Sequence, residues 1–272
     1  MKQKISDSNK QVSSGGRLQR YWTGRVTPRR RSGFANWDGK EIDAQDLASR
    51  YRIKGFEFGR YVNNGERNDY LIAAQESLKD LSDLLKTKNL GVEGVLGVAF
   101  GARGMGGRAA AHYEPGYNMI NLTKNNGNHS LAHEYGHALD YNIGTYIDQN
   151  RRYRALSGGR SMAADLDDNT GGECRNLMRK LIAEIKATKS FGRLENASAY
   201  WHYNTEVFAR FFEQWCCYQI MKKNRKNTFL AKEWSLYTRL PQYLTESDFK
   251  KVLPTANKLM KAIGLTLNGI KK

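Results

Sequence analysis

The sequence contains no long hydrophobic run. Across its 272 residues, no apolar stretch approaches the length of about 18 residues that a membrane-spanning helix needs. No apolar segment follows the basic start Met1–Lys4, so a secretory signal is not expected. We therefore expect no transmembrane helix and no membrane partner.

Cysteine is also scarce. The three cysteines are Cys174, Cys216 and Cys217, an odd number of which two are adjacent. Neither a disulfide framework nor a Cys-x-x-Cys metal site can be read from this pattern. A reducing compartment such as the cytoplasm is therefore expected.

Acidic residues are outnumbered. The chain has 27 Asp and Glu against 44 Lys and Arg, a formal net charge of +17. Such an excess favours polyanions such as nucleic acid, because binding releases their counterions. An alternative interpretation, equally supported by the composition, is that the basic surface keeps the protein soluble or holds it in a compartment that is rich in nucleic acid. Because 40% of the residues are hydrophobic, the chain can bury a core, which excludes disorder over its whole length.

The basic residues concentrate at the two ends. Residues 1–32 carry nine Lys or Arg and one acid, with few apolar residues, so residues 1–50 are predicted to be a flexible N-terminal arm. Residues 222–272 are also basic, but aromatic and aliphatic residues interleave with the charges, which predicts a helical C-terminal appendage. Residues 51–221 then form the main domain. The basic ends are the expected contacts with nucleic acid.

The main domain has an α+β pattern. Apolar residues recur at spacings of three and four over residues 69–86, which predicts a helix with one buried face. Short apolar runs bounded by turn residues predict strands, and helical periodicity follows them. The expected strands are 95–100, 109–113 and 117–122. Three further helices are expected, one that begins near residue 130, one over 176–189 and one over 205–221. A long polar loop is predicted over residues 143–172.

One motif carries recognisable chemistry. Three of the five histidines fall within nine residues, and two of them belong to the sequence His133-Glu134-Tyr135-Gly136-His137. On a helix, positions i and i+4 share a face, so both imidazoles can bind one ion. Catalytic zinc takes three protein ligands and leaves a position open for water, on which Glu134 can act as general base. This is the His-Glu-x-x-His signature of the zincins. The alternative is a pair of surface histidines on an ordinary helix.

The third zinc ligand lies outside this motif. A metzincin has a histidine ten residues after the first, where this chain has Ile143, so that class is excluded. The best candidate is Glu206, because a carboxylate in so aromatic a helix is costly to bury unless it is paired or binds metal. Glu213 is the second choice. Asp140 could ligate the ion but fits better as a partner that orients a ligating histidine.

Other side chains are candidates for roles near the metal. Arg210 follows Glu206 by four residues, and either holds one of the carboxylates or forms an ordinary surface ion pair. A tetrahedral intermediate also needs a donor that stabilises its negative charge. The candidates for that donor are Tyr203, His202 and His112.

The glycine-rich stretch 100–108 resembles a phosphate-binding loop only superficially. It lacks the Gly-Lys-Ser/Thr ending of a P-loop and the strand–glycine–helix context of a dinucleotide site. We expect a flexible hairpin tip in which Arg103 and Arg108 contact substrate or nucleic acid.

Taken together, several segments resemble a known family. They are Phe58–Val62, Glu66-Arg67, Leu96–Gly104, Ala111–Pro115, Ile120–Lys124 and Leu131–Asp140. This combination, over about residues 55–215, is similar to the large polyvalent protein-associated domains of bacteriophages and conjugative elements, which carry a zincin-like metallopeptidase signature. The resemblance implies a mobile-element protein that acts in the host cell and is carried in the virion or transferred with DNA.

The sequence therefore predicts a gluzincin-like α+β domain with two basic extensions. One zinc ion would be bound by His133, His137 and Glu206, and Glu134 would activate water against a peptide bond of a protein substrate. An endopeptidase is favoured over an exopeptidase. The alternative is a non-enzymatic module with a zincin fold that associates with nucleic acid or the virion.

Overall fold

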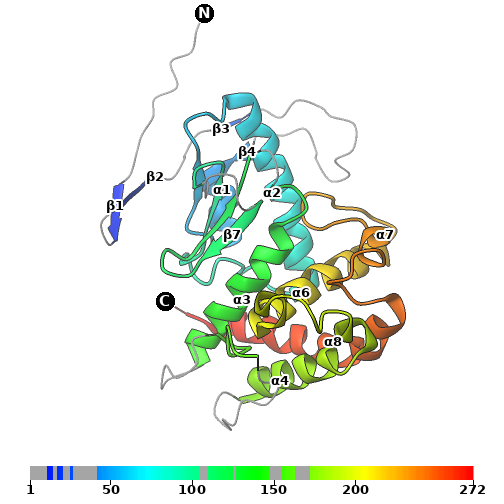
Figure 1. The fold of residues 1–272 in the computed structure, drawn as a ribbon. Helices are drawn as coiled ribbons and strands as arrows, with labels where there is room; N and C mark the ends of the chain where they lie inside the picture. The colour runs from blue at the N-terminus through cyan, green and yellow to red at the C-terminus, as the bar shows by residue number, and fades with distance from the viewer. Residues whose placement is uncertain are drawn as a thin grey trace, which may run out of the picture. The chain divides into compact units, whose positions relative to one another are not determined.

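The computed structural model describes residues 11–14, 17–20, 25–26, 42–103, 110–124, 127–147, 155–162 and 172–271 (Figure 1). The chain divides into two compact units. The first runs to Ser82 and includes Lys88–Gly127 and the last two residues, and the second consists of Asp83–Thr87 and Asn128–Ile270. A small mixed sheet lies in the first unit and most helices lie in the second, which confirms the predicted α+β class.

Most of the predicted N-terminal arm lies outside the described residues. Within it, β1 (Gln11–Ser14) pairs with β2 (Arg17–Arg20) in an antiparallel hairpin. The two-residue strands β3 (Arg25–Val26) and β4 (Ile42–Asp43) also pair antiparallel. The helix α1 (Ala44–Arg50) starts directly after β4, and the carboxylate of Asp43 caps it by accepting from the amides of Gln45 and Asp46.

A four-stranded sheet with the order β5-β6-β8-β7 is the centre of the first unit. Its strands are β5 (Phe56–Phe58), β6 (Gly97–Phe100), β7 (Ala111–Glu114) and β8 (Met119–Leu122). The central strands β6 and β8 are parallel and buried throughout, which explains their continuous apolar sequences. The three predicted strands are confirmed with small shifts at their ends, whereas β5 was not predicted.

The long helix α2 (Asn64–Leu85) contains the predicted apolar stripe. The stripe residues Leu71, Ala74, Leu78, Leu81 and Leu85 are all buried. The helix begins at a reciprocal cap, in which Asn63 Oδ1 accepts from the amide of Glu66 and Glu66 Oε2 accepts from the amide of Asn63. This cap explains why the helix starts five residues before the predicted residue 69.

The second unit is helical. Its longer helices are α3 (Leu131–Ile147), α4 (Gly172–Lys186), α6 (Asn204–Met221) and α8 (Glu246–Gly269), and its short ones are α5 (Lys189–Gly192), η1 (Ala199–His202) and α7 (Trp234–Tyr237). The helices α3 and α6 pack together closely, since a Cβ on Gly136 would lie only 3.0 Å from the Cα of Ala209. This approach brings the His-Glu-x-x-His segment against the helix that carries Glu206.

Two further predicted regions are described in part or in full. The ends of the loop predicted over 143–172 are helical, because α3 extends to Ile147 and α4 begins at Gly172, while residues 148–154 and 163–171 lie outside the described residues. Residues 222–270 include α7 and α8 as helices and belong to the second unit, where α8 packs along α4. None of the helices in the described part of the chain is both long and apolar enough to cross a membrane.

We predict that Gly264→Ala in α8 destabilises the protein by about 1–3 kcal/mol, the usual cost of overpacking. A Cβ at this position would lie 2.0 Å from the carbonyl oxygen of Leu85, so backbone has to move. The matched control is Gly269→Ala in the same helix, where a Cβ meets nothing within 4 Å. Urea unfolding of both variants is the measurement, and equal free energies of unfolding would contradict the prediction.

Candidate metal centre

Three potential metal ligands converge where α3 packs against α6. The Nε2 atom of His137 lies 3.3 Å from Oε1 of Glu206, and the Nε2 atom of His133 lies 3.6 Å from Oε2 of the same carboxylate. One ligand atom from each of the three residues lies within 4.8 Å of the others, so the group could hold a metal ion. Glu206 therefore occupies the place that the sequence predicted for the third ligand.

The local structure explains this convergence. His133 and His137 lie one turn apart on α3, and Glu206 lies in the first turn of α6, where a helix N-terminus favours negative charge. Burial alone would raise the pKa of Glu206, but the two imidazoles outweigh that effect and hold it far below its usual range. The site is thus arranged for an ionised carboxylate.

The carboxylate of Glu206 is incompletely satisfied by the protein. Its Oε2 atom is buried and has no hydrogen-bond partner among the described residues, although Nη1 of Arg210 lies 3.8 Å away. Buried oxygens without a partner are rare in proteins because leaving them unpaired is costly. A cation bound between Glu206 and the imidazoles would satisfy this oxygen, so the residues present fit a metal ion.

A hydrogen-bonded chain orients His137. Its Nδ1 atom lies 2.9 Å from the hydroxyl oxygen of Thr205, and that hydroxyl hydrogen-bonds to Asp140. The Thr205 hydroxyl donates its hydrogen bond to the Asp140 carboxylate, so its oxygen accepts a hydrogen bond from Nδ1–H of His137. The Nε2 atom of His137 then carries the lone pair, which faces Glu206. Asp140 is fully buried and also accepts from the amide and hydroxyl of Ser157, both at 2.7 Å. Asp140 thus acts on His137 through Thr205, a residue that the sequence analysis missed.

A second carboxylate faces His133 from the other side. Oε2 of the fully buried Glu213 lies 3.7 Å from Nδ1 of His133, the ring nitrogen that does not face Glu206. Burial alone would lower the pKa of His133, but Glu206 and Glu213 raise it to about 10. Glu213, considered above as the second choice of ligand, is placed to orient His133.

Three donors from beyond residue 221 hold Glu213. Lys232 Nζ donates to Oε1 at 2.6 Å, Tyr237 donates to the same oxygen at 2.9 Å, and Tyr243 donates to Oε2 at 2.7 Å. Burial would raise the pKa of Glu213, but His133 and Lys232 lower it to about 2. No sequence pattern indicates these donors, because they approach α6 only through the tertiary fold.

Glu134 on α3 and Arg210 on α6, the two remaining charged candidates, are both buried. Glu134 is 6% exposed and lies on α3 beside the first histidine. Arg210 is 5% exposed, donates to the carbonyl of Trp201 at 2.6 Å and lies over that indole ring. Its ion pair with Glu206 is therefore not an ordinary surface pair.

Tyr200 is an unpredicted residue of the site. Burial, together with the charge of Glu206, raises the pKa of its hydroxyl. Nearly half of the side chain is nevertheless exposed. The aromatic cluster Tyr200-Trp201-His202-Tyr203 directly before α6 was the available signal, but nothing in the sequence shows which of its members faces the carboxylate.

The surroundings of the other predicted donors are as follows. His202 makes a hydrogen bond through Nε2 to the carbonyl of Leu194 and packs edge-on against Phe191, while Tyr203 is the residue that precedes α6. His112 belongs to β7 in the first unit, where its Nε2 atom lies 3.5 Å from Glu114.

The predicted hairpin tip gives a mixed result. Arg103 is not free for substrate, because it forms ion pairs with Glu57 at 3.2 Å and Glu114 at 3.0 Å. Its guanidinium also lies over the ring of Tyr117. Arg108 lies outside the described residues.

We predict that Lys232→Met lowers the free energy of unfolding by about 1.5–3 kcal/mol, the usual range for a hydrogen bond to a charged group. The fully buried Glu213 would lose its lysine donor and keep two tyrosine donors. The matched control is Lys226→Met, whose ion pair with Glu233 is exposed on both sides and should change stability by less than about 1 kcal/mol. Chemical denaturation of both variants tests the difference, and a neutral Lys232→Met would contradict it.

Comparison with known proteins gives one family match. Residues 193–267 match the family model described as large polyvalent protein-associated domain 1. The matched range includes Glu206, Glu213 and the three donors of Glu213, but not α3. It overlaps the range of the sequence resemblance, about residues 55–215, only over residues 193–215, and it contains none of the segments that carry that resemblance. No curated protein and no solved structure matches the chain. The match supports the resemblance to the large polyvalent protein-associated family.

Proposed function

We propose that this protein is a zinc-dependent metallopeptidase of a phage or mobile element that acts on protein substrates in the host cell. The observation that carries the proposal is the convergence of His133, His137 and Glu206, with an unsatisfied Glu206 oxygen between them. Two imidazoles on consecutive turns of one helix and a carboxylate from a second helix are the donor set of a gluzincin. The family match over α6 is consistent with this reading.

Zinc is the metal that suits this donor set best. Two imidazoles and one carboxylate form a borderline-soft, three-ligand set that leaves a coordination position for water. Bound zinc would lower the pKa of that water toward about 7 and polarise the substrate carbonyl.

The chain's own residues prepare this chemistry. The links from His137 to Thr205 and from His133 to Glu213 fix which ring nitrogen of each histidine faces the centre. Such outer partners hold the ligands in one orientation and increase their basicity. Glu134, on the same helix as both histidines, is the general base that takes the proton of the attacking water.

Tyr200 takes the role for which Tyr203, His202 and His112 were the sequence candidates. Its hydroxyl is influenced by the charge of Glu206, and its exposure leaves it accessible to a substrate. A phenol remains protonated at neutral pH when its pKa is raised, so Tyr200 is a suitable donor to the developing oxyanion.

We predict that Glu134→Gln reduces peptide hydrolysis by about 10²–10⁴-fold, because the variant loses its general base. A library of internally quenched peptides, assayed with added zinc, provides the measurement. Glu195→Gln, a change at an exposed glutamate, is the matched control and should retain full activity. Activity of Glu134→Gln equal to that of the wild type would contradict the mechanism. A wild type inactive on every peptide would favour the non-enzymatic alternative.

We further predict that Tyr200→Phe lowers kcat by about 10²-fold or more with little change in KM, as expected for a donor that acts mainly in the transition state. Tyr203→Phe is the control, since it removes a hydroxyl three residues away. Steady-state kinetics on the library peptide that is cleaved fastest measures kcat and KM for both variants. A larger loss of kcat for Tyr203→Phe than for Tyr200→Phe would indicate that Tyr203 is the donor.

A further inference from the structure

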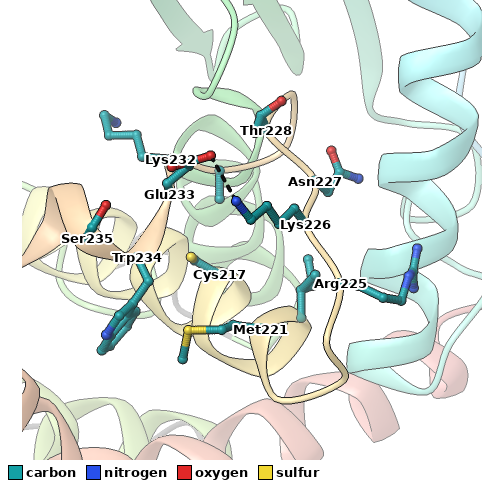
Figure 2. Close-up of a pocket in the computed structure, with 12 residues that line it drawn as sticks. Cys217, Met221, Arg225, Lys226, Asn227, Thr228, Lys232, Glu233, Trp234 and Ser235 are labelled. Carbon is teal, nitrogen blue, oxygen red and sulfur yellow. Dashed lines mark hydrogen bonds and ion pairs between the residues drawn. The ribbon is translucent and has the colours of Figure 1, made fainter. Parts of the chain in front are cut away.

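A pocket of about 180 Å³ lies at the end of α6 away from the metal ligands (Figure 2). Its apolar lining comes from the last turns of α6 and from the segment that follows, namely Cys217, Ile220, Met221, Ala231 and Trp234. Polar side chains of Arg225, Lys226, Asn227, Thr228, Lys232, Glu233 and Ser235 complete the lining. Apart from Lys232, which donates to Glu213, the proposed peptidase chemistry uses none of these residues.

The size and lining of the pocket suit one flat ring system. A dry apolar cavity of about 150 Å³ is known to hold benzene, so a pocket slightly larger and open on one side accommodates a single aromatic heterocycle. Figure 2 shows the Lys226–Glu233 ion pair on one side of the pocket and Met221 and Trp234 on the other. A ring between them would have the thioether and indole as apolar contacts and polar groups at its edge.

A basic run borders the pocket. Four of the five residues from 222 to 226 are Lys or Arg, and Lys222, Lys223 and Lys226 are exposed. Arg225 and Lys226 also line the pocket itself. Cations this closely spaced match the repeating charge of a phosphate backbone, and the chain's net charge of +17 adds attraction at long range.

The thiol in the pocket is not a nucleophile. Burial, together with the charges of Glu213 and Glu233, raises the pKa of Cys217 to about 12, so it is a neutral apolar group at physiological pH. This favours reversible binding of a ligand over covalent chemistry.

We propose that this pocket and the basic run 222–226 form a binding site for single-stranded nucleic acid, with one base inserted beside Met221 and Trp234 and the neighbouring phosphates on the cations. A duplex hides its bases in the stack, whereas a single strand presents both a base and its adjacent phosphates. An acidic peptide with an aromatic side chain is the competing occupant. The polar groups at the pocket edge favour a base, because its edge carries hydrogen-bonding atoms that an apolar side chain lacks. The proposal does not rest on the proposed peptidase function, although Lys232 both lines the pocket and donates to Glu213.

Fluorescence anisotropy with a labelled single-stranded dodecathymidylate tests the proposal on the full chain. The first comparison uses the unaltered protein and an abasic oligonucleotide of equal length and charge. Stacking of one base is worth about 1–3 kcal/mol, which converts to about 5- to 150-fold weaker binding of the abasic strand. Equal affinity for the two strands would overturn base insertion.

The second comparison separates the site from diffuse attraction. Lys222→Ala with Lys223→Ala should weaken binding and reduce the slope of log affinity against log salt by about 1.4, since each phosphate contact on a single strand contributes about 0.7. The matched control is Lys258→Ala with Lys261→Ala, which removes the same charge from exposed positions on α8 and should leave the slope nearly unchanged. Equal effects of the two pairs would overturn the site.

The third comparison locates the base and excludes the peptide. Trp234→Leu should remove the preference for the base-containing strand over the abasic one, with folding checked by circular dichroism. Met221→Ala, at a more exposed side chain, should reduce the preference in the same direction. A labelled polyglutamate peptide with one central phenylalanine should bind more weakly than the oligonucleotide. Tighter binding of the peptide, lost in Trp234→Leu, would assign the pocket to an acidic protein and contradict the proposal.

Discussion

The second unit depends on the pairing of two buried carboxylates with two imidazoles between α3 and α6. Glu206 and Glu213 are 8% and 0% exposed, and an ion removed from water costs several kcal/mol unless it is compensated. His133 faces both carboxylates through its two ring nitrogens, and His137 faces Glu206. The close approach of the helices at Gly136 brings these groups within reach. The arrangement that makes burial of the charges tolerable is also the one that gathers the metal ligands.

The short-range features of this arrangement were predictable from the sequence. Helical periodicity located α2, α3 and α6, and the i, i+4 spacing of His133 and His137 put both imidazoles on one face. Glu206 was selected because an acidic residue in an aromatic helix requires a partner. These inferences succeed because they depend on residues within a few turns of one helix.

The partners of these residues could not be predicted, because they depend on the path of the chain between helices. Thr205 forms hydrogen bonds with both Asp140 and His137. It can do so only because the turn at residues 155–162 and the start of α6 both lie beside Asp140. Tyr200 and Tyr203 are three residues apart and chemically equivalent in sequence, and the 3₁₀ turn before α6 decides that the pKa of Tyr200 is the one raised by the charge of Glu206. Similarly, the basic composition of residues 222–272 suggested a separate appendage, yet Lys232, Tyr237 and Tyr243 supply the donors that hold Glu213.

The helix α6 links the two proposed sites. Its first turn carries Glu206, its middle carries Glu213, and its last turns carry Cys217, Ile220 and Met221 of the pocket. Lys232 both lines the pocket and donates to Glu213, so the metal ligands and the pocket share one supporting side chain. The family match over residues 193–267 covers this helix and the segment that supplies Lys232.

The central claim is that His133, His137 and Glu206 bind one zinc ion. It is tested most directly by measuring bound metal per chain by mass spectrometry after purification without chelators. The account predicts about one zinc per wild-type chain and its loss in Glu206→Ala, with retention in Glu195→Ala. A wild type that takes up no zinc even when zinc is supplied, or a Glu206→Ala variant that keeps it, would contradict the account.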